Sequence, residues 1–209
     1  MYLTRMELST ERRATLKALA SPSRIHGIVE SAFSGERKRN LWRIDSLNGK
    51  VYLMILSEDE PDLSNAAAQY APLRDQTWQT KSIESLLDRV TDGSTWRFRL
   101  TANPTRSINI PGERGKVKAC VTVDDQKQWL VRKSEDNGFA VEYYGFDVVH
   151  SHWYKFQKGN DRNRTVTLRG ITYEGILTVT DKEKFKEALT RGIGRGKAYG
   201  MGLMTIIRP

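Results

Sequence analysis

LWRIDSLNGKVYLMIL, residues 41–56, consists of two apolar runs joined by a turn that contains Asn48-Gly49. Asn-Gly between apolar runs predicts an antiparallel β-hairpin, because both residues accept the positive φ angles of the tightest hairpin turns. Upstream, residues 2–8 predict a strand, and the segment ERRATLKALA, residues 11–20, predicts a helix. The hairpin is therefore expected in a unit that mixes strands and helices.

A second helix is predicted between that first helix and the hairpin. Ser21 is its expected N-cap, and Pro22 falls at the first helical position, where a missing N–H group costs little. Apolar side chains recur at helical spacing along this segment, at Ile25, Ile28, Val29, Ala32 and Phe33. This helix is expected to bury one face against the sheet.

The downstream sequence predicts that this unit is completed and then repeated. A helix around SIESLLDRV and a strand at TWRFRLTA give the order βα(α)ββαβ. Past residue 103, the segments KVKACVTV, QKQWLVRK, FAVEYYG, TVTLRGITYEGILTV, DKEKFKEAL and LMTII predict the same order again. The expected fold is α/β (α+β), with two tandem ferredoxin-like (RRM-like) domains at residues 1–103 and 104–209. The span HSHWYKFQKGNDRNR is expected to form a basic hairpin tip.

The distribution of charge indicates a polyanionic partner. The chain has 209 residues and a formal charge of +9, and residues 151–209 hold 12 Lys/Arg against 5 Asp/Glu. A basic surplus concentrated in one part of a protein that is also rich in Trp and Tyr favours nucleic acid over a membrane surface. No apolar run could span a bilayer, no signal peptide is apparent, and a single cysteine, Cys120, excludes an internal disulfide framework. A cytoplasmic location is expected.

Five glycines fall in GIGRGKAYGMGLM, residues 192–204: Gly192, Gly194, Gly196, Gly200 and Gly202. Such a run permits turns whose N–H groups face a phosphate. A Walker loop is excluded because Arg191 and Ala198 occupy required positions, and a dinucleotide loop is excluded because this segment leaves a helix and enters a strand. A tight helix-to-strand connection capped by Gly192 remains an alternative. The neighbouring Arg195 and Lys197 favour a nucleic-acid contact.

The chain has only three histidines, and His26 is the candidate for acid–base chemistry. It lies one residue off the apolar stripe of its helix, on the same side as Ser23 and Glu30. A structural histidine is the more frequent explanation of such a position. His150 and His152 would share one face of a strand, but no third metal ligand is evident, so no metal and no cofactor are expected. Cys120 lies within an apolar alternation and is expected in the core.

Several segments resemble the CasE family, the endoribonucleases of type I-E CRISPR (Cascade) systems that cut precursor CRISPR RNA within each repeat. The matching segments are MYLTRMEL, the helix with His26, FRLTANPTRSI, QWLVRK, ITYEGILTVTD and GIGRGKAYGMGLMTI. The last is the most specific, and the resemblance extends from end to end. It implies two ferredoxin-like domains, in agreement with the predicted strand order.

The resemblance also implies a reaction. A ribose 2′-OH attacks the adjacent phosphate on the 3′ side of the repeat hairpin without a metal, giving 2′,3′-cyclic phosphate and 5′-OH ends. His26 occupies the position of the family's central acid/base histidine, and its expected role is to protonate the departing 5′ oxygen. Several family members have a tyrosine three residues earlier, whereas this chain has Ser23, a shorter donor. Either another group compensates or cleavage is slower.

The expected RNA contacts come from both domains. Near His26 they are Arg24, Arg37, Lys38 and Arg39, and in the glycine-rich segment they are Arg195 and Lys197. The family's basic hairpin matches Lys155, Lys158, Arg162 and Arg164. Secondary candidates near the domain junction are Arg106, Arg114, Lys116 and Lys118. A solvated surface cation is the simplest reading of any one of these, so the cluster carries the prediction.

Three functions are thus in competition. The first is an endoribonuclease that stays bound to its mature CRISPR RNA, joins the other Cascade subunits and is a monomer outside that complex. The second is a subunit that binds the RNA hairpin with little or no cleavage, which the departure at Ser23 makes a serious alternative. The third is an RRM-like binder of single strands, which is disfavoured because the strands lack the aromatic signature of that class.

Overall fold

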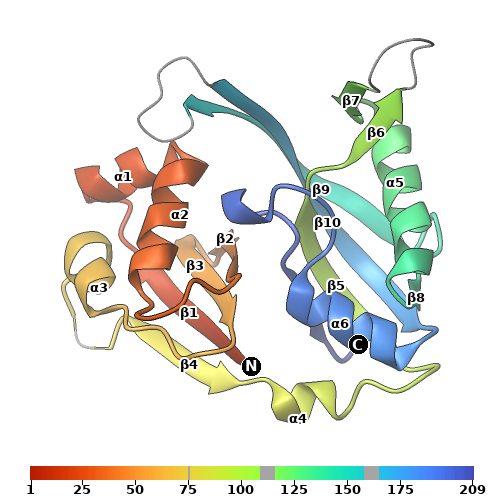
Figure 1. The fold of residues 1–209 in the computed structure, drawn as a ribbon, viewed down its shortest axis with the longest axis horizontal. Helices are drawn as coiled ribbons and strands as arrows, with labels where there is room; N and C mark the ends of the chain where they lie inside the picture. Colours follow the sequence, from red (N-terminus) through yellow and green to blue (C-terminus); the bar gives the residue numbers. More distant parts are fainter. Residues whose placement is uncertain (75, 109–115, 158–164) are drawn as a thin grey trace.

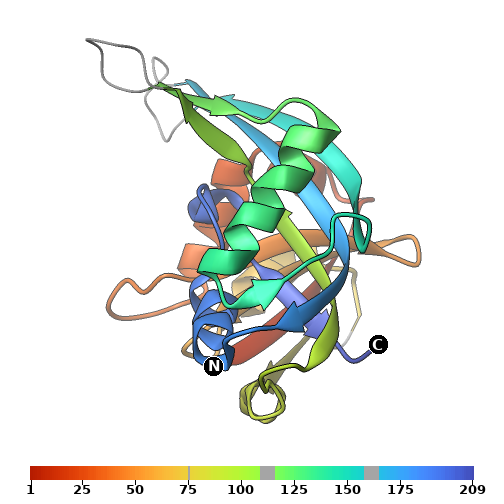
Figure 2. The same cartoon turned by 90° about the vertical axis from the view of Figure 1, so that its right-hand side faces the viewer.

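The computed structural model describes residues 1–74, 76–108, 116–157 and 165–209. Two sheets lie between helices α1, α2 and α3 on one side and α5 on the other (Figure 1). Figure 2 shows α5 lying across the second sheet. The mixed α+β fold with two ferredoxin-like units agrees with the sequence prediction. No helix among the described residues is long and apolar enough to cross a bilayer.

The first unit is a complete ferredoxin-like domain. Its elements are β1 (Tyr2–Leu8), α1 (Arg13–Leu19), α2 (Pro22–Ser31), β2 (Leu41–Leu47), β3 (Lys50–Ser57), α3 (Ser64–Tyr70) and β4 (Trp78–Ser82). The strands are ordered β2-β3-β1-β4, and each neighbouring pair is antiparallel. The predicted β2–β3 hairpin is confirmed, with Asn48 at φ 51° and Gly49 at φ 74°. Ser21 is the N-cap of α2, although its side chain makes no capping hydrogen bond.

The second unit follows the short helix α4 (Glu84–Leu87) and repeats the strand order with additions. Its elements are β5 (Thr95–Ala102), β6 (Thr105–Ile108), β7 (Lys116–Ala119), α5 (Val123–Asp136), β8 (Phe139–Ala140), β9 (Phe146–Gln157), β10 (Thr165–Val179), α6 (Lys182–Arg191), the 3₁₀ helix η1 (Lys197–Tyr199) and β11 (Met204–Ile207). The sheet runs β11-β5-β10, and both β8 and β9 pair with β10. Strands β6 and β7 form a separate two-stranded hairpin.

The assignment of strands to units corrects the sequence prediction in three places. The strand TWRFRLTA, expected to close the first unit, is β5 and pairs with β10 and β11 of the second sheet. The first sheet is closed instead by β4, which was not predicted, and KVKA belongs to the β6–β7 hairpin. The sheets therefore divide between Ser82 and Thr95, whereas a boundary between folding domains at residue 103 remains a prediction. Residues 150–157, expected in a hairpin tip, lie within β9.

Each unit has its own apolar core. In the first, α2 buries Ile25, Ile28 and Val29 against strand residues such as Leu53 and Ile55. In the second, the core includes Trp129 of α5, Phe185 of α6 and the β5 side chains Trp96, Phe98 and Leu100. A third and smaller apolar cluster includes Leu41, Leu56, Ile83 and Leu203 and joins the two units. The predicted apolar stripe of α2 is thus a real core face.

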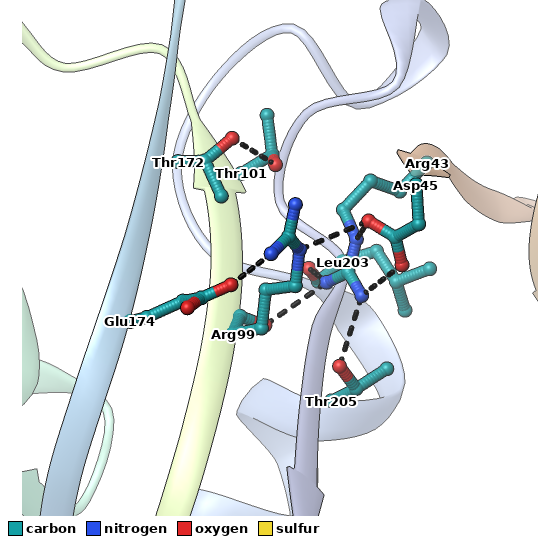
Figure 3. A network of polar contacts seen from close by, with 8 residues as sticks. All are labelled: Arg43, Asp45, Arg99, Thr101, Thr172, Glu174, Leu203 and Thr205. Atoms are coloured by element: carbon teal, nitrogen blue, oxygen red, sulfur yellow. Dashed lines mark hydrogen bonds and ion pairs between the residues drawn. The ribbon is translucent and has the colours of Figure 1, made fainter. Parts of the chain in front are cut away.

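A buried arginine also ties the sheets together (Figure 3). Arg43 of β2 is only 2% exposed. Its guanidinium pairs with Asp45 through two hydrogen bonds of 2.8 and 2.7 Å and donates to the carbonyl oxygens of Arg99 and Leu203, both at 2.9 Å. A further 2.9 Å bond reaches the Thr205 hydroxyl. One side chain of the first sheet thus satisfies acceptors on β5 and near β11 of the second.

Candidate functional site

A basic cleft of about 670 Å³ lies where α2 meets the glycine-rich segment. Its lining residues are His26, Glu30, Arg37, Lys38, Arg39, Asn40 and residues 194–199. The cleft brings together His26, Arg37, Lys38, Arg39, Arg195 and Lys197 from the predicted set. It therefore joins a helix of the first unit to the α6–β11 connection of the second.

His26 is held at the edge of α2 with its side chain 23% exposed. Its Nε2 lies 3.2 Å from Nη2 of Arg37, whose Nε donates to the Glu30 carboxylate at 2.6 Å. Because arginine can only donate, Nε2 must accept, which places the imidazole hydrogen on Nδ1. Nδ1 is buried, has no hydrogen-bond partner among the described residues and lies 3.9 Å from Glu30. The resting site thus holds a neutral imidazole with Nε2 in the cleft.

The environment of His26 also favours the neutral form. Burial lowers the pKa of His26 below its ordinary value, the Glu30 carboxylate raises it, and the Arg37 guanidinium lowers it again. Burial is the largest of these effects because a desolvated imidazolium loses its hydration. A phosphate that entered the cleft would act in the opposite direction, because a nearby anion favours the charged ring. The protonation of His26 is therefore sensitive to an anionic ligand.

Tyr199 is a cleft residue that the sequence analysis missed. Its ring meets the His26 imidazole edge-on, with 6.5 Å between the ring centroids. The centroid of the Phe156 ring of β9 lies 4.9 Å from that of Tyr199. It ends the 3₁₀ helix η1, which Gly196 and Gly200 flank in the left-handed conformation. Its place within the most family-specific segment was the signal that could have identified it.

The glycines of the segment have packing reasons for their identity. A Cβ on Gly200 would lie 2.6 Å from the Trp42 ring, and one on Gly192 would lie 2.8 Å from the Leu41 side chain. Both partners belong to β2, so these glycines allow the connection to pack against the first unit. Gly192 is also the C-cap of α6, as the alternative explanation predicted. Gly202 faces the Ile193 carbonyl, whereas Gly194 and Gly196 line the cleft.

The cations of the cleft differ in how they are held. Lys38 is paired with Asp59 at 2.8 Å and Glu58 at 3.3 Å. Lys197 donates to the Arg191 carbonyl at 2.7 Å, and burial lowers its pKa, with smaller contributions from Arg39 and Arg191. Arg37 is largely exposed although it bridges His26 and Glu30. The cleft thus presents several positive charges to one shared space.

Other predicted site residues lie elsewhere. Within the described chain, Ser23 and Arg24 of α2 do not line the cleft; Ser23 is half-buried and Arg24 is exposed. Lys155 is exposed on β9, and Arg106 of β6 pairs with Asp125 at 3.4 Å. Lys116 and Lys118 are exposed on β7. Arg114, Lys158, Arg162 and Arg164 lie outside the described residues.

Among the described residues, the remaining candidates for chemistry do not line the cleft of His26. His150 and His152 stack on one face of β9 with ring centroids 6.3 Å apart. Across the described ranges, no three His, Cys, Asp or Glu side chains gather as potential metal ligands. Cys120 is buried in the core as predicted, and burial raises the pKa of its thiol.

Fold and cleft together define a class: a tandem ferredoxin-like protein with one histidine in a basic cleft at the junction of its units. The family model described as CRISPR associated protein matches residues 1–208, and the chain belongs to this family.

Similar proteins are known from two bacteria. The chain is 29% identical to the CRISPR-associated endoribonuclease Cse3 of Thermus thermophilus over 99% of both chains. It is also 29% identical to the Cascade subunit CasE of Escherichia coli over 61% of this chain and 64% of that protein. A solved structure of Cse3 bound to a 19-nucleotide RNA superposes with a TM-score of 0.84, at 28% identity, covering 99% of this chain and 100% of the other.

Proposed function

We propose that this chain is a metal-independent endoribonuclease that binds the stem-loop of a CRISPR repeat and cleaves the precursor RNA on the 3′ side of the hairpin. The observation that carries the proposal is the position of His26, a neutral imidazole with Nε2 in a cleft lined by arginines. Full-length similarity to an endoribonuclease of the same family supports the same reaction class.

RNA supplies its own nucleophile in this reaction. The 2′-oxygen forms a bond to phosphorus as the bond from phosphorus to the 5′-oxygen breaks, which leaves a 2′,3′-cyclic phosphate and a 5′-OH. The proton of the 2′-OH passes to water. The bound phosphate raises the pKa of His26, so that the ring takes up a proton and donates it to the departing 5′-oxygen. Positioned proton transfer of this kind contributes about 10² to 10⁴ in rate.

Arg37 has two roles in this proposal. In the free protein its guanidinium donates to Nε2 of His26, which blocks that nitrogen. An RNA phosphate is a stronger acceptor than a neutral imidazole, so Arg37 turns to the phosphate and frees Nε2. Arg39 and Arg195 line the same cleft and stabilise the charge that develops on the phosphate oxygens. Ser23 lies outside the cleft lining, so Tyr199 is the hydroxyl-bearing side chain beside His26.

RNA affinity is assigned to cations of both units. In addition to those in the cleft, the exposed Lys155, Arg106, Lys116 and Lys118 supply charge along the second unit. The glycine-rich segment contributes main-chain groups between residues 194 and 199. After cleavage the protein keeps its mature RNA as a cytoplasmic subunit of Cascade, and it is a monomer outside that complex.

The decisive experiment uses repeat RNA in EDTA, with and without a 2′-deoxy sugar at the cut site. We expect cleavage of the normal RNA and none of the deoxy RNA, because only the former has a nucleophile. Equal processing of the two would exclude 2′-OH attack. Intact normal RNA in a tight complex would instead support the alternative, a hairpin-binding subunit without cleavage, which the absence of Ser23 from the cleft lining favours.

A further inference from the structure

A second cleft of about 670 Å³ lies on the other side of Tyr199. One side of this cleft is formed by the edge strand β2 and the start of α2. The other side is formed by one face of the paired strands β9 and β10. Tyr199 lines both this cleft and the basic cleft of His26. We call this second cleft the β2–β9 groove. An RNA strand that passes over the Tyr199 ring would therefore lead from the His26 cleft directly into this groove.

The two walls of the groove differ in chemistry. The wall from the first unit is mainly apolar, although Arg43 and Ser46 also line it; its apolar residues are Leu19, Pro22, Ile25, Trp42, Ile44 and Val51. On the opposite wall, alternate β9 residues His150, His152 and Tyr154 share one face, since side chains of a strand alternate. The two imidazoles are nearly parallel, with an interplanar angle of 10°. The ring centroids of His152 and Tyr154 are 4.6 Å apart.

One polar group of this groove lacks a partner. Trp42 is 3% exposed, and its Nε1 has no hydrogen-bond acceptor in the described structure. A buried indole N–H without an acceptor is unusual and costs stability. The charged side chains Arg99 and Glu174, by contrast, also line the groove but pair with each other. The groove thus offers flat apolar and ring surfaces and little free charge, whereas the unpaired Trp42 Nε1 is itself buried.

We propose that the β2–β9 groove binds one unpaired nucleotide of the RNA, the first one on the 3′ side of the scissile phosphate. Its volume is too small for a duplex, so the paired stem must stay outside. A cut at the 3′ side of a hairpin leaves the next nucleotide unpaired, and its base can lie between the imidazoles and the apolar wall. Bases stack on aromatic side chains with little sequence preference, so the groove selects an unpaired base rather than one particular base.

This subsite rests on the proposed function, and its role would be to position the leaving group of the reaction. Holding the first downstream nucleotide fixes the ribose that carries the departing 5′-oxygen, and this oxygen is the atom that receives the proton from His26. A loosely held leaving group would reduce the rate even with His26 in place, because catalysis depends on the alignment of the reacting atoms. His150 and His152 are therefore positioning residues, not catalytic ones.

The test compares two repeat RNAs that differ only at the first nucleotide after the cut, which carries either a base or an abasic sugar. Single-turnover cleavage is measured for the natural protein, for the double variant H150A/H152A and for the control W153A. Trp153 lies beside His152 on β9, faces the other side of the strand and stacks with Arg169. The same pair of RNAs with a 2′-deoxy sugar at the cut site gives dissociation constants without cleavage.

We expect the natural protein and W153A to cleave the abasic RNA about tenfold more slowly, since a stacked base contributes about that much or more. H150A/H152A should cleave the normal RNA about tenfold more slowly and show no further loss with the abasic RNA. Equal cleavage of both RNAs by the natural protein, or an undiminished preference in the double variant, would refute the subsite. If no RNA is cleaved, the proposed function fails. The subsite is then tested by the dissociation constants alone: weaker binding of the abasic RNA supports it, and equal binding of the two RNAs refutes it.

Discussion

The two ferredoxin-like units share one strand order but contribute differently to the site. The first joins β2 and β3 by the tight turn Asn48-Gly49, and its proposed acid/base group, His26, stands on a helix packed into the core. The second has longer strands, since β9 and β10 have 12 and 15 residues, and its α6–β11 connection carries the glycine-rich segment. A rigid helix suits proton transfer, because the donor atom must be held in a fixed position. Long strands and a glycine-rich connection suit contact with a long ligand.

The largest effect should come from the first unit. Replacement H26A removes the proton donor, so cleavage of repeat RNA should fall about 10²- to 10⁴-fold. Affinity should stay within a few-fold, because one neutral side chain is lost and no cation. Single-turnover kinetics and binding of 2′-deoxy RNA measure the two quantities. A variant that cleaves at the natural rate would remove His26 from the mechanism.

The next effect tests the contact between the units. In R43A, the Asp45 carboxylate keeps only the partly exposed Arg99 as a partner, and two carbonyl groups lose their donor. Leaving a buried charge unpaired typically costs about 3–5 kcal/mol, and because Arg99 still pairs with Asp45, chemical denaturation should show a loss near the lower end of this range, about 3 kcal/mol, in the free energy of unfolding. The exposed arginine variant R13A is the control and should change this free energy by less than about 0.5 kcal/mol. A small loss in R43A would mean that the apolar cluster alone joins the units.

A glycine pair separates backbone strain from packing. Gly200 and Gly93 have similar φ angles, 80° and 76°, but only a Cβ on Gly200 meets a neighbour, the Trp42 ring. Both G200A and G93A place alanine in the left-handed region, whereas only G200A overpacks the junction. We expect G200A to lose about 1–3 kcal/mol more than G93A, measured by thermal or chemical unfolding. Equal losses would show that the glycine-rich segment does not need its close approach to β2.

The coupling between RNA and His26 predicts a pH effect on affinity. Burial lowers the His26 pKa in the free protein, and a bound phosphate should raise it, so binding takes up a proton. RNA affinity should therefore increase as pH falls through the interval between the two pKa values, by at most about tenfold per pH unit. NMR titration of His26, free and with 2′-deoxy RNA, measures both pKa values. H26A is the control and should lose this pH dependence.

The smallest effect should come from a single cation of the second unit. Replacement K155A removes one exposed charge on β9, so the slope of log affinity against log salt should decrease by about 0.7 to 0.9. The cleavage rate at saturating RNA should be unchanged, in contrast to H26A. An unchanged salt slope would mean that Lys155 meets no phosphate.

The sequence predicted the fold wherever a local signal was sufficient. Asn48-Gly49 located the first hairpin, and the spacing of Ile25, Ile28 and Val29 located α2. The strand β4 was missed because its residues are mostly exposed and show no apolar alternation. Strand β5 was predicted but was assigned to the wrong unit. The alternation of Trp96, Phe98 and Leu100 indicates that one face of the strand is buried, but it does not indicate which strand pairs with β5.

The site was predicted in part for a similar reason. His26, Arg37 and Arg39 are near in sequence, and the charge beside the glycine-rich run pointed to Arg195 and Lys197; the cleft brings all five together. Tyr199 was missed because its contact with His26 joins residues far apart in the chain. Ser23 was expected beside His26 from helical spacing, but that spacing fixes the side of a helix and not the limits of a cleft.

The order of the elements along the chain has a consequence for synthesis on the ribosome. The first sheet is complete once Ser82 has emerged, so its helix α2 can already hold His26 in place. Residues 194–199, which form the opposite wall of the cleft, are translated more than a hundred residues later. A nascent chain therefore holds His26 on a packed helix long before the other wall of its cleft has been synthesised.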